Sequence, residues 1–114
     1  EETDYEMLKK YQLSFTQMKN LFQYARRKKI EVFSAPFDLV SVNELEKLNV
    51  NFYKLASFDL INLPLVEKVA KTMKPIILST GMANLSEIEE ALSIISTCGN
   101  DRVALLHCTS TYPL

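Results

Sequence analysis

Several short apolar runs of this 114-residue sequence are followed by hydroxyl-bearing or charged residues that could do chemistry. The clearest case is residues 74–82, where Pro75 and three branched apolar residues precede Ser79, Thr80 and Gly81. A short apolar run bounded by Pro and Gly is typical of a strand buried on both faces. Two hydroxyls and a glycine at the carboxyl end of a strand, beside a helix N-terminus, can bind an anion, because free backbone N–H groups point there. An ordinary polar turn is the alternative interpretation.

Polar side chains also follow the other apolar runs. They are Ser34 at the end of the first run, Lys54, Ser57 and Asp59 within or just after the second, and Ser110 and Tyr112 at the end of the last. In barrels and open parallel sheets alike, ligands bind beyond the carboxyl ends of the strands. Hydroxyls, glycine N–H groups and one ammonium suit a phosphate or carboxylate. Chance is the competing explanation, because Ser and Thr are common at strand ends.

Three of these positions allow more than one interpretation. Lys54 can bind an anion, form a Schiff base if it is desolvated, or pair with a carboxylate at the surface. Asp59 can act in proton transfer or simply favour the start of the next helix. If Cys108 and Ser110 face the side of the sheet that bears the site, strand alternation turns His107 toward the helices, which predicts a packed structural histidine. A single His without a second ligand gives no metal site in this segment.

Helices and strands are predicted to alternate along the chain, which would bring these residues together. Apolar periodicity and capping signals predict helices from Ser14, from Ser41, over residues 62–73 and from Asn84 to Gly99, with strands over residues 30–34, 52–57, 74–82 and 102–110. Residues 1–13 are predicted to be a loop with one helical turn. This alternation indicates a parallel sheet covered by helices.

The regular spacing of the strands favours a (β/α) barrel over an open sheet. No G-x-G-x-x-G follows any strand, which argues against a dinucleotide-binding fold. Four strands leave two open edges and bare apolar faces. The chain is therefore interpreted as a partial segment of a larger α/β barrel.

Composition is that of an ordinary globular domain, with 47% hydrophobic residues, 24% charged residues and a formal net charge of −1. The basic cluster at residues 26–29 ends a predicted helix, and no basic stripe continues from it, so a nucleic-acid partner is not expected. No apolar run approaches the roughly 18 residues that span a bilayer. Cys98 and Cys108 lack paired spacing, which indicates reduced thiols in a cytoplasmic protein. Because the sequence starts without Met, an upstream portion is expected to be missing.

Four segments carry a family likeness. They read SAPFD at 34–38, YKLASFD at 53–59, KPIILSTGM at 74–82 and LLHCTSTYP at 105–113. In sequence, order and spacing they resemble the serial strand motifs of the N-acetylneuraminate (sialic acid) synthase family, which includes pseudaminic and legionaminic acid synthases. The likeness covers nearly the whole chain from about residue 14.

The resemblance implies an enzyme on a (β/α)8 TIM barrel, of which this chain supplies about strands three to six. Such enzymes condense phosphoenolpyruvate with an N-acetylated amino sugar, such as N-acetylmannosamine, and release phosphate. It further implies a divalent metal, Mn or Mg, whose ligands lie outside this segment. A C-terminal antifreeze-like domain, absent from this chain, and a homodimer are also implied.

Carried over position by position, the likeness implies that Lys54, Ser57, Ser79 and Ser110 hold the phosphate and carboxylate of phosphoenolpyruvate. Thr80 and Gly81 would line the same pocket, Asp59 would stand near the reacting carbon, and Tyr112 would lie beside the sugar. The implied catalytic residues are thus Lys54 and Asp59, with an electrostatic role for the lysine.

The sequence departs from the family pattern at two positions. Ala35 stands where many members have a Thr that contacts the phosphate, and Phe58 replaces a frequent Gly. The Phe58 version is closer to pseudaminic acid synthases, whereas His107 before Cys108 is closer to the sialic or legionaminic side, so the sugar stays open. The alternatives are another phosphoenolpyruvate-dependent sugar-acid synthase on a barrel and a non-catalytic barrel fragment.

Overall fold

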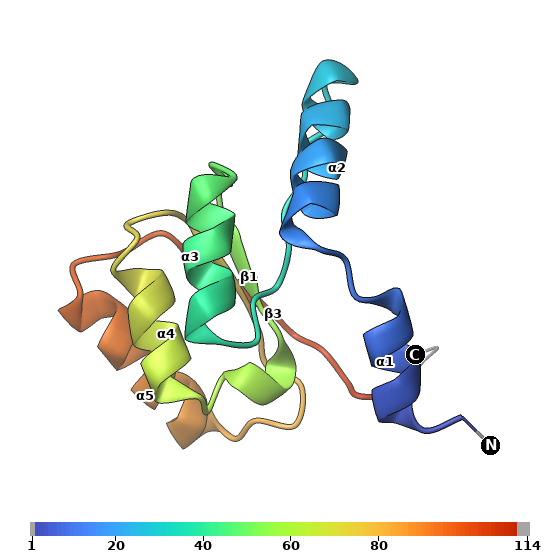
Figure 1. Cartoon of the computed structure of the whole chain (residues 1–114). Coiled ribbons are helices and arrows are strands. Elements are labelled where there is room, and N and C mark those ends of the chain that lie inside the picture. Colours follow the sequence, from blue (N-terminus) through green and yellow to red (C-terminus); the bar gives the residue numbers. More distant parts are fainter. Residues whose placement is uncertain (1, 112–114) are drawn as a thin grey trace. The chain divides into compact units, whose positions relative to one another are not determined.

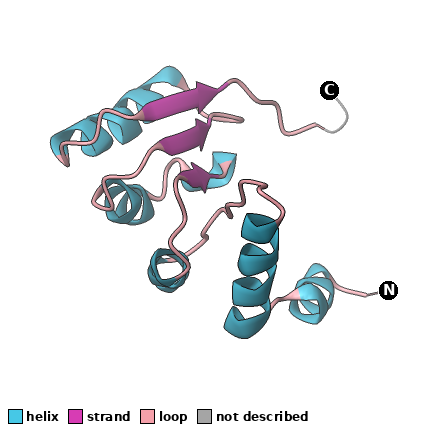
Figure 2. Cartoon of the chain, turned by 90° about the horizontal axis from the view of Figure 1, so that it is seen from above, coloured by secondary structure: helices cyan, strands magenta, loops and turns pink. Residues whose placement is uncertain are grey.

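A parallel sheet of three strands lies in the second of the two units into which the chain divides, Glu1–Val32 and Phe33–Leu114. The computed structural model describes residues 2–111. The strands are β1 (Tyr53–Leu55), β2 (Ile76–Ser79) and β3 (Val103–Leu106), which pair in the order β1-β2-β3 (Figure 2). Both pairings are parallel, and their register aligns Lys54 with Ile77 and Ile77 with Ala104. The predicted parallel sheet is therefore confirmed.

Three helices of the second unit lie side by side (Figure 1); the first precedes β1, and the other two connect successive strands. They are α3 (Leu39–Lys47), α4 (Leu63–Ala70) and α5 (Leu85–Thr97), and a single 3₁₀ turn, η1 (Ser57–Asp59), lies between β1 and α4. A helix between successive parallel strands is the connection that a parallel sheet requires. The carboxyl ends of the three strands consequently point the same way.

The helices cover one face of the sheet. Tyr53, Leu55, Ile76 and Leu78 are buried, whereas Lys54 and Ile77, which alternate with them, are only half-buried. Side chains of successive strand residues point to opposite faces, so the half-buried residues lie on the other side of the sheet. The core of this unit consists of apolar residues from β1, β2, α3, α4, α5 and the adjoining turns: Val42, Leu45, Leu48, Val50, Tyr53, Leu55, Leu60, Leu65, Val66, Val69, Ala70, Ile76, Leu78, Ala91 and Ile95.

Local signals determine where the helices begin and end. The Asn84 side chain accepts from the backbone N–H of Glu87, and the Glu87 carboxylate accepts from that of Asn84, so the predicted capping box of α5 is present. Gly99 has φ 83°, which a helix C-terminus favours in glycine. Helix α3 begins earlier than predicted, because Asp38, rather than Ser41, is its cap and accepts from the Ser41 N–H at 2.6 Å.

The first unit contains two helices, α1 (Asp4–Tyr11) and α2 (Phe15–Arg27). The capping box of Ser14 and Gln17 is present, as predicted. The single helical turn predicted within residues 1–13 is longer than predicted and forms α1, because Thr3 and Glu6 form a capping box of the same kind. The Thr-x-x-Glu pattern was the sequence signal for α1.

The strand predicted over residues 30–34 is absent, since residues 30–36 form no strand ladder in the structure. Apolar composition favours a strand, but a strand also needs a neighbour that pairs with its backbone N–H and C=O groups. Phe33 instead packs its ring on Phe52, with 4.6 Å between the ring centroids. The described part of the sheet therefore has three strands rather than the four predicted, and β3 is shorter than predicted.

Candidate functional site

Ser57, Gly81 and Ser110 come together from three separate chain segments, which follow β1, β2 and β3 respectively. The backbone N–H of Gly81 donates to the Ser57 Oγ at 3.0 Å. A Cβ placed on Gly81 would lie 2.9 Å from the Ser57 Oγ and 3.4 Å from the Ser110 Oγ. Both hydroxyls thus lie within reach of one small ligand beside a glycine backbone.

Lys54 and Ser79 lie on the same side of the sheet. Lys54 is opposite Ile77 in the register, and Ser79 follows Ile77 by two residues, so the three side chains share one face. Lys54 and Ser79 are diagonal neighbours on adjacent strands, so roughly 8 Å separates their backbone positions. The register therefore places Lys54 and Ser79 on one face of the sheet.

Thr80 connects the ends of two strands. Its backbone N–H donates to the Leu106 carbonyl at 3.1 Å, and its hydroxyl donates to the same carbonyl at 2.9 Å. The single hydroxyl proton is thereby used within the protein. Thr80 therefore stabilises the pairing of β2 with β3 at the edge where the site lies.

Asp59, at the end of η1, is a buried carboxylate with an unsatisfied oxygen. The residue is 4% exposed, and its Oδ2 has no hydrogen-bond partner among the described residues. Burial raises the pKa of the Asp59 carboxyl, and a hydrogen bond from the Asn62 side chain partly offsets the increase. A carboxyl with a raised pKa can hold and transfer a proton closer to neutral pH than an exposed one can.

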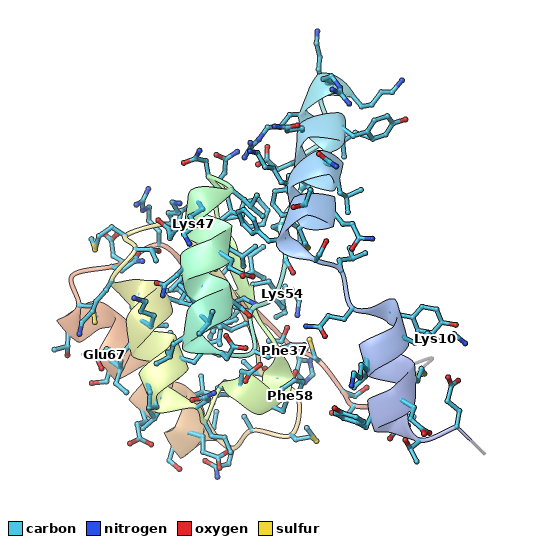
Figure 3. All side chains as sticks on the ribbon, viewed as in Figure 1. Lys10, Phe37, Lys47, Lys54, Phe58 and Glu67 are labelled. Atoms are coloured by element: carbon cyan, nitrogen blue, oxygen red, sulfur yellow. The ribbon has the colours of Figure 1, made fainter. Side chains whose placement is uncertain are left out.

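An exposed apolar surface adjoins the serines. Phe58 is 57% exposed and packs on Phe37, with 5.3 Å between the ring centroids; both are marked in Figure 3. A pocket of about 150 Å³ lies beside this pair, and its lining consists of Ser57, Phe58, Ile61, Gly81, Met82, Ala83 and Glu87. Met82 adopts a left-handed backbone conformation with φ 66°, which is uncommon outside glycine and recurs at functional sites.

This apolar surface was not predicted from the sequence. The available signal was the presence of Phe58 and Ile61, two large apolar residues, directly after a strand end. Large exposed apolar side chains next to polar site residues commonly mark a binding surface.

Three other predictions concern residues outside this cluster. Ser34 lies in the irregular segment before α3, and Tyr112 lies outside the described residues. His107 is exposed, so the prediction that it packs against the helices was wrong: β3 ends at Leu106, and strand alternation no longer fixes the direction of the next side chain.

Cys98 and Cys108 are both free thiols. Over residues 2–111 there is no group of three His, Cys, Asp or Glu side chains that could hold a metal ion.

Comparison with known proteins gives one consistent family. The model of the NeuB family matches residues 1–114. The chain is 44% identical over 115 residues to an N,N'-diacetyllegionaminic acid synthase of Campylobacter jejuni, covering 99% of this chain and 34% of that protein. It is 40% identical over 109 residues to a pseudaminic acid synthase of Helicobacter pylori, covering 96% and 32% respectively.

Solved structures of similar proteins agree with the family match. An N-acetylneuraminic acid synthetase from Leptospira borgpetersenii, crystallised with citrate, superposes with a TM-score of 0.86 at 36% identity over 90% of this chain and 36% of that one. A phospho-2-dehydro-3-deoxyheptonate aldolase of Thermotoga maritima has a TM-score of 0.74 at 17% identity, covering 88% of this chain and 30% of that one, and this likeness concerns the fold alone. The chain spans about a third of the length of the curated relatives that it matches. On the family match and these identities, the chain belongs to the NeuB family.

Proposed function

We propose that this chain is the phosphoenolpyruvate-binding segment of a nonulosonic acid synthase. The enzyme would condense phosphoenolpyruvate with the open aldehyde form of an N-acetylated hexosamine and release phosphate. The observation that carries the proposal is the convergence of Ser57, Gly81 and Ser110 at the carboxyl ends of three parallel strands. Membership of a family with named sugar-acid synthases supports the same reaction class.

The intact enzyme would be a (β/α)8 barrel in which β1, β2 and β3 are three of the eight strands. The supporting observations are the parallel order β1-β2-β3, the helix between successive strands and the length of the relatives. Ligands of such barrels bind at the carboxyl ends of the strands. The cluster of serines occupies that edge.

In this reaction a C–C bond forms between C3 of phosphoenolpyruvate and the aldehyde carbon of the sugar. Water supplies the oxygen that remains at C2, and the phosphate group leaves. Phosphoenolpyruvate carries several negative charges, so the ammonium of Lys54 and the hydroxyls of Ser57, Ser79 and Ser110 would hold it in place. Interactions with charge that develops on the departing phosphate would accelerate the reaction.

Asp59 would serve as the acidic group near the reacting carbon. Its raised pKa and its unpaired Oδ2 are the properties that a proton-transfer group needs. Lys54 would act through its charge, and Thr80, whose hydroxyl proton is already used, would position the strand ends.

The remaining components of the proposal come from the family likeness. They are a Mn or Mg ion, a sugar-contacting Tyr112, a homodimer with an antifreeze-like domain, and a cytoplasmic location. By the same likeness, the ligands of the ion would lie elsewhere in the enzyme. None of the helices over residues 2–111 has the length and apolar character needed to cross a membrane.

The test is a phosphate-release assay on the intact protein with phosphoenolpyruvate, Mn and a panel of sugars. We expect release only with N-acetylated hexosamines. The panel should include unacetylated pentose and tetrose phosphates, because the fold is shared with a synthase of a seven-carbon sugar acid. Release with those sugars alone would identify the alternative synthase, and no release with any sugar would favour a non-catalytic role.

A further inference from the structure

The contact between Gly81 and Ser57 determines which hydrogen-bonding groups Ser57 can offer a ligand. A serine hydroxyl has one proton to donate and two lone pairs to accept with. The Gly81 N–H donates to the Ser57 Oγ at 3.0 Å, so one lone pair is occupied and the proton is not used in this bond. Ser57 can therefore present its O–H to a ligand, as an anion requires.

The same contact depends on the absence of a side chain at Gly81. A Cβ there would lie 2.9 Å from the Ser57 Oγ, 3.3 Å from the Ser57 Cβ and 3.4 Å from the Ser110 Oγ. Moving Ser57 away would break its hydrogen bond with the Gly81 N–H. Movement of Ser110 would separate the two hydroxyls.

The need for glycine at this position is one of space rather than backbone conformation. Among the described glycines only Gly99 has a positive φ, at 83°, and a Cβ placed on Gly99 would meet nothing within 4 Å. Glycine is thus needed at position 99 for the backbone conformation and at position 81 for the lack of a side chain. Gly99 gives a matched control, since alanine there affects the backbone without crowding the site.

We infer that Gly81 is a positioning residue for the anion: its N–H orients Ser57 as a donor, and its missing side chain keeps Ser57 and Ser110 within reach of one phosphate or carboxylate group. This inference rests on the proposed function. The new element is that Gly81 affects anion binding through the hydroxyl of Ser57. The expected consequence is a non-additive response to changes at Gly81 and Ser57.

A double-mutant cycle in the intact protein tests the inference, with Ser57→Ala, Gly81→Ala and both together. We expect each single change to raise KM for phosphoenolpyruvate by about ten- to a hundredfold. The KM of the double variant for phosphoenolpyruvate should be no more than about twofold above the higher of the two single-variant values. Gly99→Ala should lower the melting temperature and leave KM unchanged.

The outcomes separate the two levels of the proposal. If Ser57→Ala leaves KM unchanged, the proposed anion site itself is wrong. If Ser57→Ala raises KM but Gly81→Ala does not, or if the two effects multiply, the positioning role is wrong and the site stands.

A second variant covers the case in which Gly81→Ala does not fold. Ser57→Gly combined with Gly81→Ala removes the two crowded atoms of Ser57, and we expect a normal melting temperature with KM as high as in Ser57→Gly alone. A KM for this pair several-fold above that of Ser57→Gly would show that alanine acts directly on the ligand, and would overturn the inference.

Discussion

The hydroxyl of Tyr53 donates to a carboxylate oxygen of Glu46 at 2.7 Å, joining β1 to α3. The Val42 carbonyl of α3 lies 3.2 Å from the same hydroxyl, and Lys74 Nζ contacts the same Glu46 oxygen at 2.6 Å. Because the Tyr53 side chain is held among the helices, the next residue, Lys54, must face the opposite side of the sheet. A contact in the helical layer thus sets the direction of a candidate site residue.

The first prediction concerns Tyr53→Phe in the intact protein. Removing a hydrogen bond to a charged group should lower the free energy of unfolding by about 1.5–3 kcal/mol. Urea unfolding measures the change. Tyr11→Phe is the control, because Tyr11 is 68% exposed and should give no change. An equal loss in both variants would show that the contact with Glu46 contributes nothing.

The second prediction concerns Lys54→Ala, which should raise KM for phosphoenolpyruvate by about ten- to a hundredfold, because a charge-assisted contact is lost. Lys54→Arg should restore part of the affinity. Lys47→Ala, at the exposed end of α3, is the matched control and should behave as the wild type (Figure 3). Steady-state kinetics at constant ionic strength decide the matter, and an unchanged KM would exclude the lysine from the site.

The third prediction concerns Asp59→Asn and its dependence on pH. The pKa of the Asp59 carboxyl is raised above its ordinary value of 3.8, so the folded state holds this proton more tightly than the unfolded state does. The protonated Asp59 carboxyl therefore contributes to the free energy of unfolding. This contribution is fully present below the ordinary pKa of 3.8 and is lost as pH rises through the raised pKa of the folded state.

Asparagine does not ionise, so Asp59→Asn removes the loss of stability that the wild type shows as pH rises. The variant should therefore be more stable than the wild type at pH 7, by about 1–3 kcal/mol, and the difference should vanish toward pH 4. If Asp59 transfers a proton in the reaction, the same variant should have a lower kcat. Unfolding at several pH values together with kcat checks both, and a variant that is less stable at pH 7 would contradict the buried-charge argument.

The fourth prediction concerns Phe58→Ala. The exposed ring borders the pocket that Ser57 and Gly81 also line, and we expect it to contact an apolar part of the sugar in the proposed reaction. Its removal should raise KM for the amino sugar by about three- to tenfold and leave KM for phosphoenolpyruvate within twofold. Phosphoenolpyruvate serves as the internal control, and equal changes in both constants would point to a general disturbance of η1.

Local signals in the sequence were sufficient for some elements. Ser14 with Gln17 and Asn84 with Glu87 predicted two helix starts correctly, because a capping box is formed by residues three positions apart. The parallel order of the strands followed from the alternation of elements. The common face of Lys54 and Ser79 follows from strand alternation and the register.

Other features depend on partners that local patterns do not specify. Residues 30–34 have strand composition, but no ladder forms there, and Phe33 contacts Phe52 through its ring instead. The spacing of the sequence could not reveal that Gly81 lies against Ser57, 24 residues away, or that the Thr80 hydroxyl is used by Leu106. These contacts arise only when strands from distant parts of the chain are aligned in register.

The outer strands of the described sheet, β1 and β3, each have one edge without a strand partner over residues 2–111. Such an edge accepts another parallel strand without loss of an existing ladder bond. The segment is therefore suited to transplantation as a block: replacing the corresponding third of the Campylobacter jejuni relative, 44% identical, should give a chimera that folds. The KM of the hybrid for phosphoenolpyruvate would be set by this chain, and its sugar specificity would be set in part by the recipient.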